Sequence, residues 1–157
     1  REIFPKMKWK VPVSVHHKLL PGLSKPVDSD SSQVLGKMSK SDPNSGIFIH
    51  NTDDEIKKKI SKSWCEETNI QSNPLLEIAK TVIFHEFNEM NVERPEKFGG
   101  NVSYSNYNEL ETDFAENKLH PGDLKQTVGS YLVKVISPIR EKLNLSEEIS
   151  EAIKKSF

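Results

Sequence analysis

The sequence predicts a mainly α-helical protein in which a short strand and a long polar loop come before a helical bundle. Apolar residues recur at helical spacing from residue 51 onward, which indicates amphipathic helices. Residues 24–46 are rich in Ser, Asp, Gly and Pro, a composition typical of loops. Residues 11–15 form a brief apolar run that reads as a strand. We therefore expect two domains, residues 1–50 and residues 51–157, with the bundle in the second.

The amino-terminal residues predict a helix end followed by this strand and a turn. Residues 1–6 resemble the interior of a helix that begins before residue 1, and we therefore expect the chain to be a fragment. A lone strand is unstable by itself, so we expect the partners of residues 11–15 to lie in sequence absent from this chain.

Capping residues mark the first helices of the bundle. Thr52 is a suitable N-cap before three acidic residues, and Asn73 with Pro74 opens a second helix. Asn106 with Glu109 three residues later resembles a capping pair. The side chains expected to be buried in these helices are Ile56, Ile60, Leu75, Leu76, Ile78, Ala79, Val82, Ile83, Leu110 and Phe114.

The longest helix is expected to begin at residues 120–123. Pro138 lies inside its pattern and should kink or break it. Ser146 is a candidate cap for a last short helix that ends at Phe157. The apolar stripe of the long helix consists of Leu124, Val128, Leu132, Val135, Ile136 and Ile139.

The overall composition limits the classes of protein to consider. No run approaches the roughly 20 apolar residues that span a bilayer, so we expect no membrane partner. Cys65 is the single cysteine, which favours a reducing compartment such as the cytoplasm. With no second cysteine, we predict no metal site. The net charge of −1 means that a nucleic acid would have to be held by local clusters of Lys and Arg.

The polar loop holds the segment with the clearest chemistry. Lys37 and Lys40 flank small polar residues, and flexible ammonium groups beside backbone amides and hydroxyls suit phosphate oxygens. For an arbitrary loop of this composition, two solvated lysines would be the ordinary interpretation. The residues Lys37-Met38-Ser39-Lys40-Ser41, however, match in full the KMSKS signature of class I aminoacyl-tRNA synthetases.

The resemblance extends over nearly the whole chain. It is strongest to the tyrosyl-tRNA synthetases of archaea and eukaryotes, in the strand and turn before the signature and in three segments after it. These segments are residues 12–16 with 19–23, 94–100, 119–125 and 137–143. The resemblance implies the carboxy-terminal edge of a Rossmann-like α/β catalytic domain, followed by an α-helical anticodon-binding bundle.

The family's activity follows from the resemblance as an expectation. It implies ATP-dependent ligation of tyrosine to tRNA(Tyr), with Mg²⁺ accompanying ATP, and a homodimer formed through the missing half. Lys37 and Lys40 would be catalytic and would neutralise charge on the phosphates as pyrophosphate leaves. Met38, Ser39 and Ser41 would complete this ATP-binding segment. The chain lacks the family's amino-terminal motifs, so we expect it to be inactive alone.

His16 is a further candidate for the nucleotide pocket, because it leaves the expected strand just before the loop. The alternative is an ordinary turn residue.

The resemblance also implies a tRNA anticodon-binding site. Phe98 would stack on an anticodon base, Asp123 would read the first anticodon base, and His120 and Cys65 would lie in the same pocket. From the residues alone, Phe98 could instead close a turn, and Asp123 could satisfy free amides at a helix start. Cys65 could be a small buried hydrophobe.

Two other functions remain open from the sequence. Residues 40–48 resemble the tryptophanyl-tRNA synthetases, which share the overall plan. A non-catalytic tRNA-binding helical module that keeps the loop as a relic is the alternative from another class. Lys57, Lys58, Lys59 and Lys62 form the best local patch for tRNA phosphates, although such a run is usually a solvated helix face.

Overall fold

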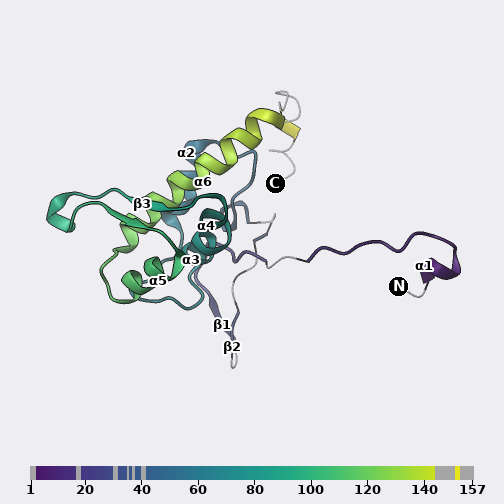
Figure 1. The fold of residues 1–157 in the computed structure, drawn as a ribbon, viewed down its shortest axis with the longest axis horizontal. Coiled ribbons are helices and arrows are strands. Elements are labelled where there is room, and N and C mark those ends of the chain that lie inside the picture. The colour runs from purple at the N-terminus through teal and green to yellow at the C-terminus, as the bar shows by residue number, and fades with distance from the viewer. Residues whose placement is uncertain are drawn as a thin grey trace.

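A helical body, two short β-hairpins and a long amino-terminal arm make up the structure, a computed structural model (Figure 1). The structure describes residues 3–16, 19–29, 32–34, 36, 38–39, 42–143 and 151–152. The mainly α-helical character predicted from the sequence is confirmed. In the described residues, no helix is both long and apolar enough to cross a membrane.

The amino-terminal arm extends away from the body and ends in the short helix α1 (Ile3–Lys6) (Figure 1). The strand predicted at residues 11–15 is wrong for this structure, where the backbone has no assigned strand. Val13 and Val15 are 91% and 88% exposed. The physical reason is that a strand needs a neighbour to complete its hydrogen bonds, and none pairs with this segment in the described part of the chain.

The polar segment is more ordered than the predicted loop. Strand β1 (Val27–Ser29) pairs antiparallel with β2 (Ser32–Val34), and the 3₁₀-helix η1 (Pro43–Ser45) follows. Asp42 caps η1 by accepting a hydrogen bond from the Asn44 backbone N–H. The prediction of loop structure throughout residues 24–46 is therefore wrong, because a short hairpin satisfies backbone groups within it.

Helix α2 (Asp53–Lys62) packs against α6 (Pro121–Leu143). The predicted N-cap is confirmed, since Thr52 and Glu55 form a reciprocal capping box. Ile56 and Ile60 are fully buried, and burying such a side chain stabilises a fold by about 1.5–3 kcal/mol. These two residues therefore fix the face of α2 that meets α6.

A second helical segment supplies much of the core. It consists of α3 (Pro74–Ile78), the π-helical turn η2 (Ala79–Ile83) and α4 (Phe84–Glu86). Asn73 caps α3, as predicted, by accepting hydrogen bonds from two backbone N–H groups. The predicted apolar positions are buried, except that Val82 is only half-buried. The change to π-helical geometry at Ala79 was not predicted.

A hairpin that the sequence did not predict follows this segment. Strands β3 (Met90–Val92) and β4 (Val102–Tyr104) pair antiparallel and carry the 3₁₀-helix η3 (Glu96–Phe98) near their tip. Met90, Val92 and Tyr104 are buried in the core.

The last two helices confirm most of the predicted pattern. Asn106 caps α5 (Tyr107–Ala115), in which Leu110 and Phe114 are fully buried. In α6 the predicted stripe is buried at four positions, whereas Val135 is half-buried and Ile139 is 42% exposed. The predicted cap at Ser146 lies outside the described residues.

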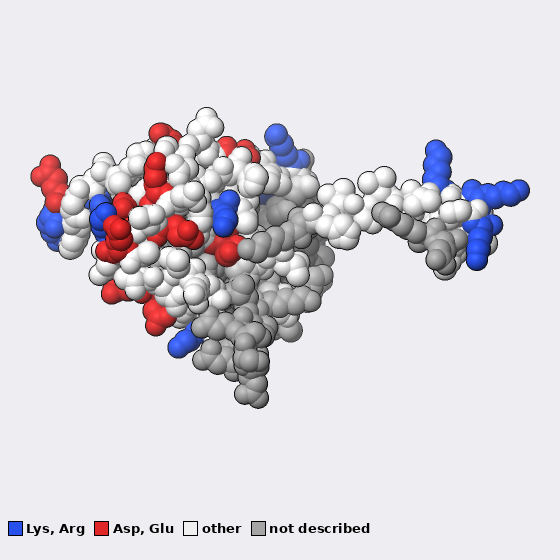
Figure 2. Space-filling view, turned by 60° about the horizontal axis from the view of Figure 1, so that its bottom comes forward, with Lys and Arg blue, Asp and Glu red and all other residues white. Residues whose placement is uncertain are grey.

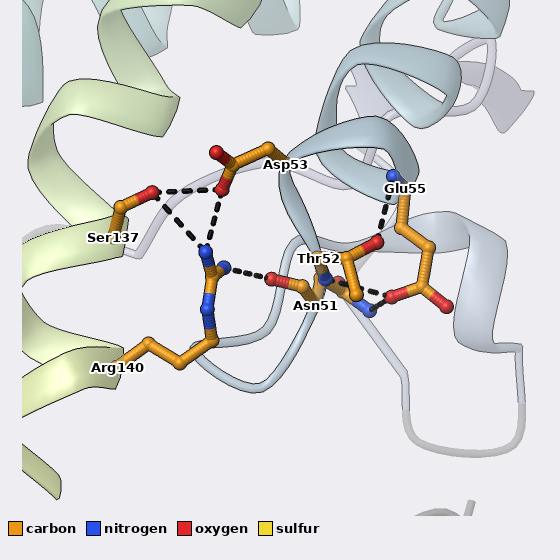
Figure 3. A network of polar contacts seen from close by, with 6 residues as sticks. All are labelled: Asn51, Thr52, Asp53, Glu55, Ser137 and Arg140. Carbon is orange, nitrogen blue, oxygen red and sulfur yellow. Dashed lines mark hydrogen bonds and ion pairs between the residues drawn. The ribbon is translucent and has the colours of Figure 1, made fainter. Parts of the chain in front are cut away.

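Pro138 does not break α6, which continues to Leu143. A polar network holds the helix on both sides of this proline (Figure 3). Arg140 donates to the Asn51 carbonyl and, at 2.6 Å, to the Asp53 carboxylate, which also accepts from Ser137 at 2.7 Å. These contacts tie the end of α6 to the start of α2, so tertiary structure overrides the local effect of the proline.

We predict that Arg140→Met lowers stability in a pH-dependent way. Hydrogen bonds from Arg140 and Ser137 lower the pKa of Asp53 below its ordinary 3.8. A carboxyl with a lowered folded-state pKa contributes stability above the ordinary value and loses it as the pH falls through the folded value. The urea midpoint of the variant should be below wild type near neutral pH, and the gap should shrink well below pH 3.8.

The matched control is Lys142→Met, which removes an exposed cation from the same helix end. Equal midpoints for Arg140→Met and this control would contradict the prediction.

Candidate functional site

The predicted site residues lie in the signature loop, in the body and, for His16, in the amino-terminal arm. Lys37, Lys40 and Ser41 lie outside the described residues. Met38 and Ser39 are described and are both partly buried. The site is therefore described from the residues at the base of the signature loop and from the candidate anticodon-binding residues of the body.

Ser45 closes the base of the signature loop. It is buried, and its hydroxyl accepts a hydrogen bond from the Ser39 backbone N–H at 2.9 Å. The same hydroxyl donates to the Asp42 carbonyl at 2.6 Å, while the Ser45 carbonyl accepts from the Leu23 N–H. One buried side chain thus joins both ends of the turn that follows Met38.

Lys59 attaches this loop base to α2. Its ammonium donates to the Gly46 carbonyl and to the Asn51 side-chain oxygen, each at 3.0 Å, and lies 4.8 Å from the centre of the Phe48 ring. Burial lowers the pKa of Lys59. A Cβ at Gly46 would stand 3.1 Å from the Met38 side chain, so Met38 rests directly on this glycine. The signature segment is thus anchored to the helical body through its carboxy-terminal side.

His16 does not join this arrangement in the described part of the chain. It lies exposed in the extended arm, and no hydrogen bond or ion pair connects it to the described loop residues. Its proposed place in the nucleotide pocket therefore stays a prediction.

Phe98 lies exposed near the tip of the β3–β4 hairpin. Its side chain is 60% exposed, with the Lys97 ammonium 4.7 Å from the ring centre. Gly99 and Gly100 follow with φ angles of 100° and 69°, values that favour glycine. Most of the Phe98 side chain is therefore accessible to another molecule.

Arg94 fixes the hairpin tip, a role that the sequence analysis missed. Its Nε donates to the Gly100 carbonyl at 2.7 Å and its Nη1 donates to the Lys118 carbonyl at 2.8 Å. The Arg94 backbone N–H donates to the Asn101 side chain. Because Lys118 lies two residues before His120, Arg94 couples the Phe98 hairpin to the turn that opens α6. An arginine beside a Gly-Gly turn was the available sequence signal.

His120 caps α6 and leaves Asp123 free. The His120 Nδ1 atom accepts a hydrogen bond from the Gly122 N–H at 3.0 Å, and its Nε2 lies 3.5 Å from a Glu67 carboxylate oxygen. Asp123 is the third residue of α6, where the positive end of the helix favours its charge. Its carboxylate makes no hydrogen bond or ion pair with any described residue. It can therefore accept hydrogen bonds from a ligand.

Cys65 is partly buried beside the body. Asn73 donates to its sulfur at 3.5 Å, and burial raises the pKa of the thiol. Cys65 also lines a cleft of about 940 Å³ together with Lys125, which follows Asp123 by two residues. Cys65 thus packs partly against the core, as the simpler interpretation expected, and also borders this cleft.

No group of three His, Cys, Asp or Glu side chains capable of holding a metal occurs among the described residues. Mg²⁺ that accompanies a nucleotide needs no such cluster, because phosphates and water supply most of its ligands.

Comparison with known proteins shows the family of this chain. The family described as tRNA synthetases class I (W and Y) matches residues 1–137, and the chain belongs to this family. The tyrosine–tRNA ligase of Thermococcus sibiricus is 41% identical over 98% of this chain and 46% of its own length. That of Pyrococcus abyssi is 45% identical over 83% of this chain and 37% of its own length.

Solved structures show the same relationship. The tyrosyl-tRNA synthetase of Pyrococcus horikoshii, complexed with L-tyrosine, is 40% identical to this chain and superposes with a TM-score of 0.79. The match covers 89% of this chain and 40% of the Pyrococcus horikoshii chain. The Archaeoglobus fulgidus enzyme gives a TM-score of 0.74 at 35% identity, over 92% of this chain and 42% of its own. The resemblance to tyrosyl-tRNA synthetases is confirmed, and the chain spans less than half the length of these relatives.

We predict that Arg94→Met loosens the hairpin tip and speeds trypsin cleavage after Lys97 several-fold. The variant removes the donors that hold the Gly100 and Lys118 carbonyls, so local opening of the tip becomes more frequent. Cleavage after Lys10 in the exposed arm provides an internal control. An unchanged ratio of the two cleavage rates would contradict the positioning role of Arg94.

Proposed function

We propose that this chain supplies the signature loop and the tRNA-identifying surface of a tyrosine–tRNA ligase. The enzyme joins tyrosine to tRNA(Tyr) with ATP, and acts as a homodimer through parts outside this chain. The observation that carries the proposal is the pairing of a complete KMSKS segment with a helical body that presents an exposed Phe98 and an unengaged Asp123 carboxylate. The similarity to tyrosine–tRNA ligases supports tyrosine over tryptophan as the amino acid.

In this proposal the loop stabilises charge on ATP. Lys37 and Lys40 neutralise the charge that develops on the phosphates when pyrophosphate leaves. Met38, Ser39 and Ser41 complete the ATP-binding segment, and Mg²⁺ accompanies the nucleotide. Such contacts accelerate the reaction only if they are stronger in the transition state than in the ground state. Ser45 and Lys59 hold the base of the loop, and from this base Lys37 and Lys40 would reach the phosphates.

The helical surface identifies the tRNA. The Asp123 carboxylate accepts hydrogen bonds from the amino and imino groups of an unpaired guanine, and Phe98 stacks on an anticodon base. His120 orients the start of α6 by its cap and so shapes the pocket, which Cys65 borders. Arg94 holds the stacking residue and the reading residue in a fixed relation.

The experiment compares tRNA(Tyr) transcripts that differ only in the first anticodon base. Wild type should bind the guanine transcript more tightly, and Asp123→Asn should lose most of this preference. Phe98→Ala should weaken binding of both transcripts by roughly 1–3 kcal/mol, the usual contribution of one base stack. Fluorescence anisotropy with labelled transcripts measures each Kd.

Matched controls separate these effects from loss of structure. Asp54→Asn removes a first-turn carboxylate from α2, and Leu143→Ala removes an exposed apolar side chain from α6. Equal affinity of wild type for both transcripts would instead favour a tRNA-binding module that does not read the anticodon. Absence of salt-dependent tRNA binding would contradict both interpretations.

A further inference from the structure

A cleft outside the signature segment lies between the start of the polar segment and α2. Its volume is about 940 Å³, within the range of ligand-binding sites. Leu23–Lys25 and Pro43–Asn44 form one wall, and residues of α2 form the other. Trp64, Cys65 and Lys125 extend it toward the start of α6. The cleft therefore reaches from the base of the signature loop to Lys125, two residues after Asp123 along α6.

Positive charge is concentrated in this cleft. Among the described residues, its lining contains five lysines and a single carboxylate, Glu55, which caps α2 through the Thr52 N–H. Two of the lysines are engaged: Lys59 binds the Gly46 carbonyl, and Lys125 donates to the Ser61 carbonyl at 3.2 Å. The other three are Lys25, Lys58 and Lys62, which are exposed and whose ammonium groups make no hydrogen bond or ion pair with described residues.

This concentration is local and is unfavourable for the chain alone. The net charge is −1, and Asp and Glu are spread over the face of the helical body seen in Figure 2. Lys58 and Lys62 stand four residues apart on α2, a spacing at which like charges destabilise a helix by about 0.2–0.5 kcal/mol. A polyanion in the cleft would relieve this repulsion.

We propose that the cleft binds backbone phosphates of the RNA whose anticodon is read near Asp123. The inference rests on the proposed function and extends it to a second contact region, with Lys58 and Lys62 as its principal cations. Lysines act as mobile point charges, which suit phosphates approached in varying geometry and carry no base specificity. Lys125 in the cleft follows Asp123 by two residues along α6, about 3 Å of helix rise, so an RNA strand bound at Asp123 lies within reach of the cleft.

The test is the salt dependence of tRNA binding by the 157-residue chain. The variant Lys58→Gln/Lys62→Gln is compared with Lys134→Gln/Lys142→Gln, which removes two exposed lysines outside the cleft and changes the net charge equally. Each lost phosphate contact lowers the slope of log affinity against log salt by roughly 0.7–0.9. The cleft variant should lose one to two such contacts and on the order of tenfold in affinity at low salt.

The loss should be the same for transcripts with either first anticodon base, so the ratio of their Kd values stays at the wild-type value. Binding of ATP, the other source of phosphate, should be unchanged by the cleft variant. A slope and affinity equal to those of the control would overturn the proposal while leaving anticodon reading intact. A collapse of the Kd ratio, or loss of ATP binding with tRNA binding unchanged, would also overturn it. Failure of wild type to bind tRNA would refute the proposed function as well.

Discussion

The packing of α2 along α6 is the interaction on which the rest of the structure depends. Ile56 and Ile60 are fully buried, and at Gly129 an added Cβ would lie only 3.7 Å from Ile60, so the two helices approach closely. Arg140 ties α6 to the start of α2. Because α2 begins just after the signature loop and α6 begins at the anticodon candidates, this contact sets the position of one candidate region against the other.

The same contact explains how the loop and the helical body act together. Lys59 lies on α2 but donates to the carbonyl of Gly46, so the loop base is attached to the helix. Two residues further along α2, the Ser61 carbonyl accepts a hydrogen bond from Lys125 of α6. The lysine-lined cleft lies between these two attachments. An RNA bound in the cleft would therefore contact the body that holds both the signature loop and the proposed anticodon-binding residues.

Local signals predicted the parts of this fold that are themselves local. The caps at Thr52 and Asn106 were predictable because their partners lie three residues away. The β3–β4 hairpin was missed because three-residue strands are too short for a periodic pattern. The predicted break at Pro138 does not occur, and there Arg140 ties α6 to a segment distant in the sequence. The resemblance supplied Asp123, whereas the role of Arg94 depends on a carbonyl 24 residues away.

Native-state hydrogen exchange tests most directly whether α2 and α6 form one cooperative unit. If they do, the slowest amides of both helices, around Ile60 and Leu132, open with the same free energy and respond equally to denaturant. Opening of the α2 amides at a clearly lower free energy than those of α6, with no denaturant dependence, would contradict the account. In that case α2 would unfold alone, and the link between the loop base and the anticodon surface would not exist.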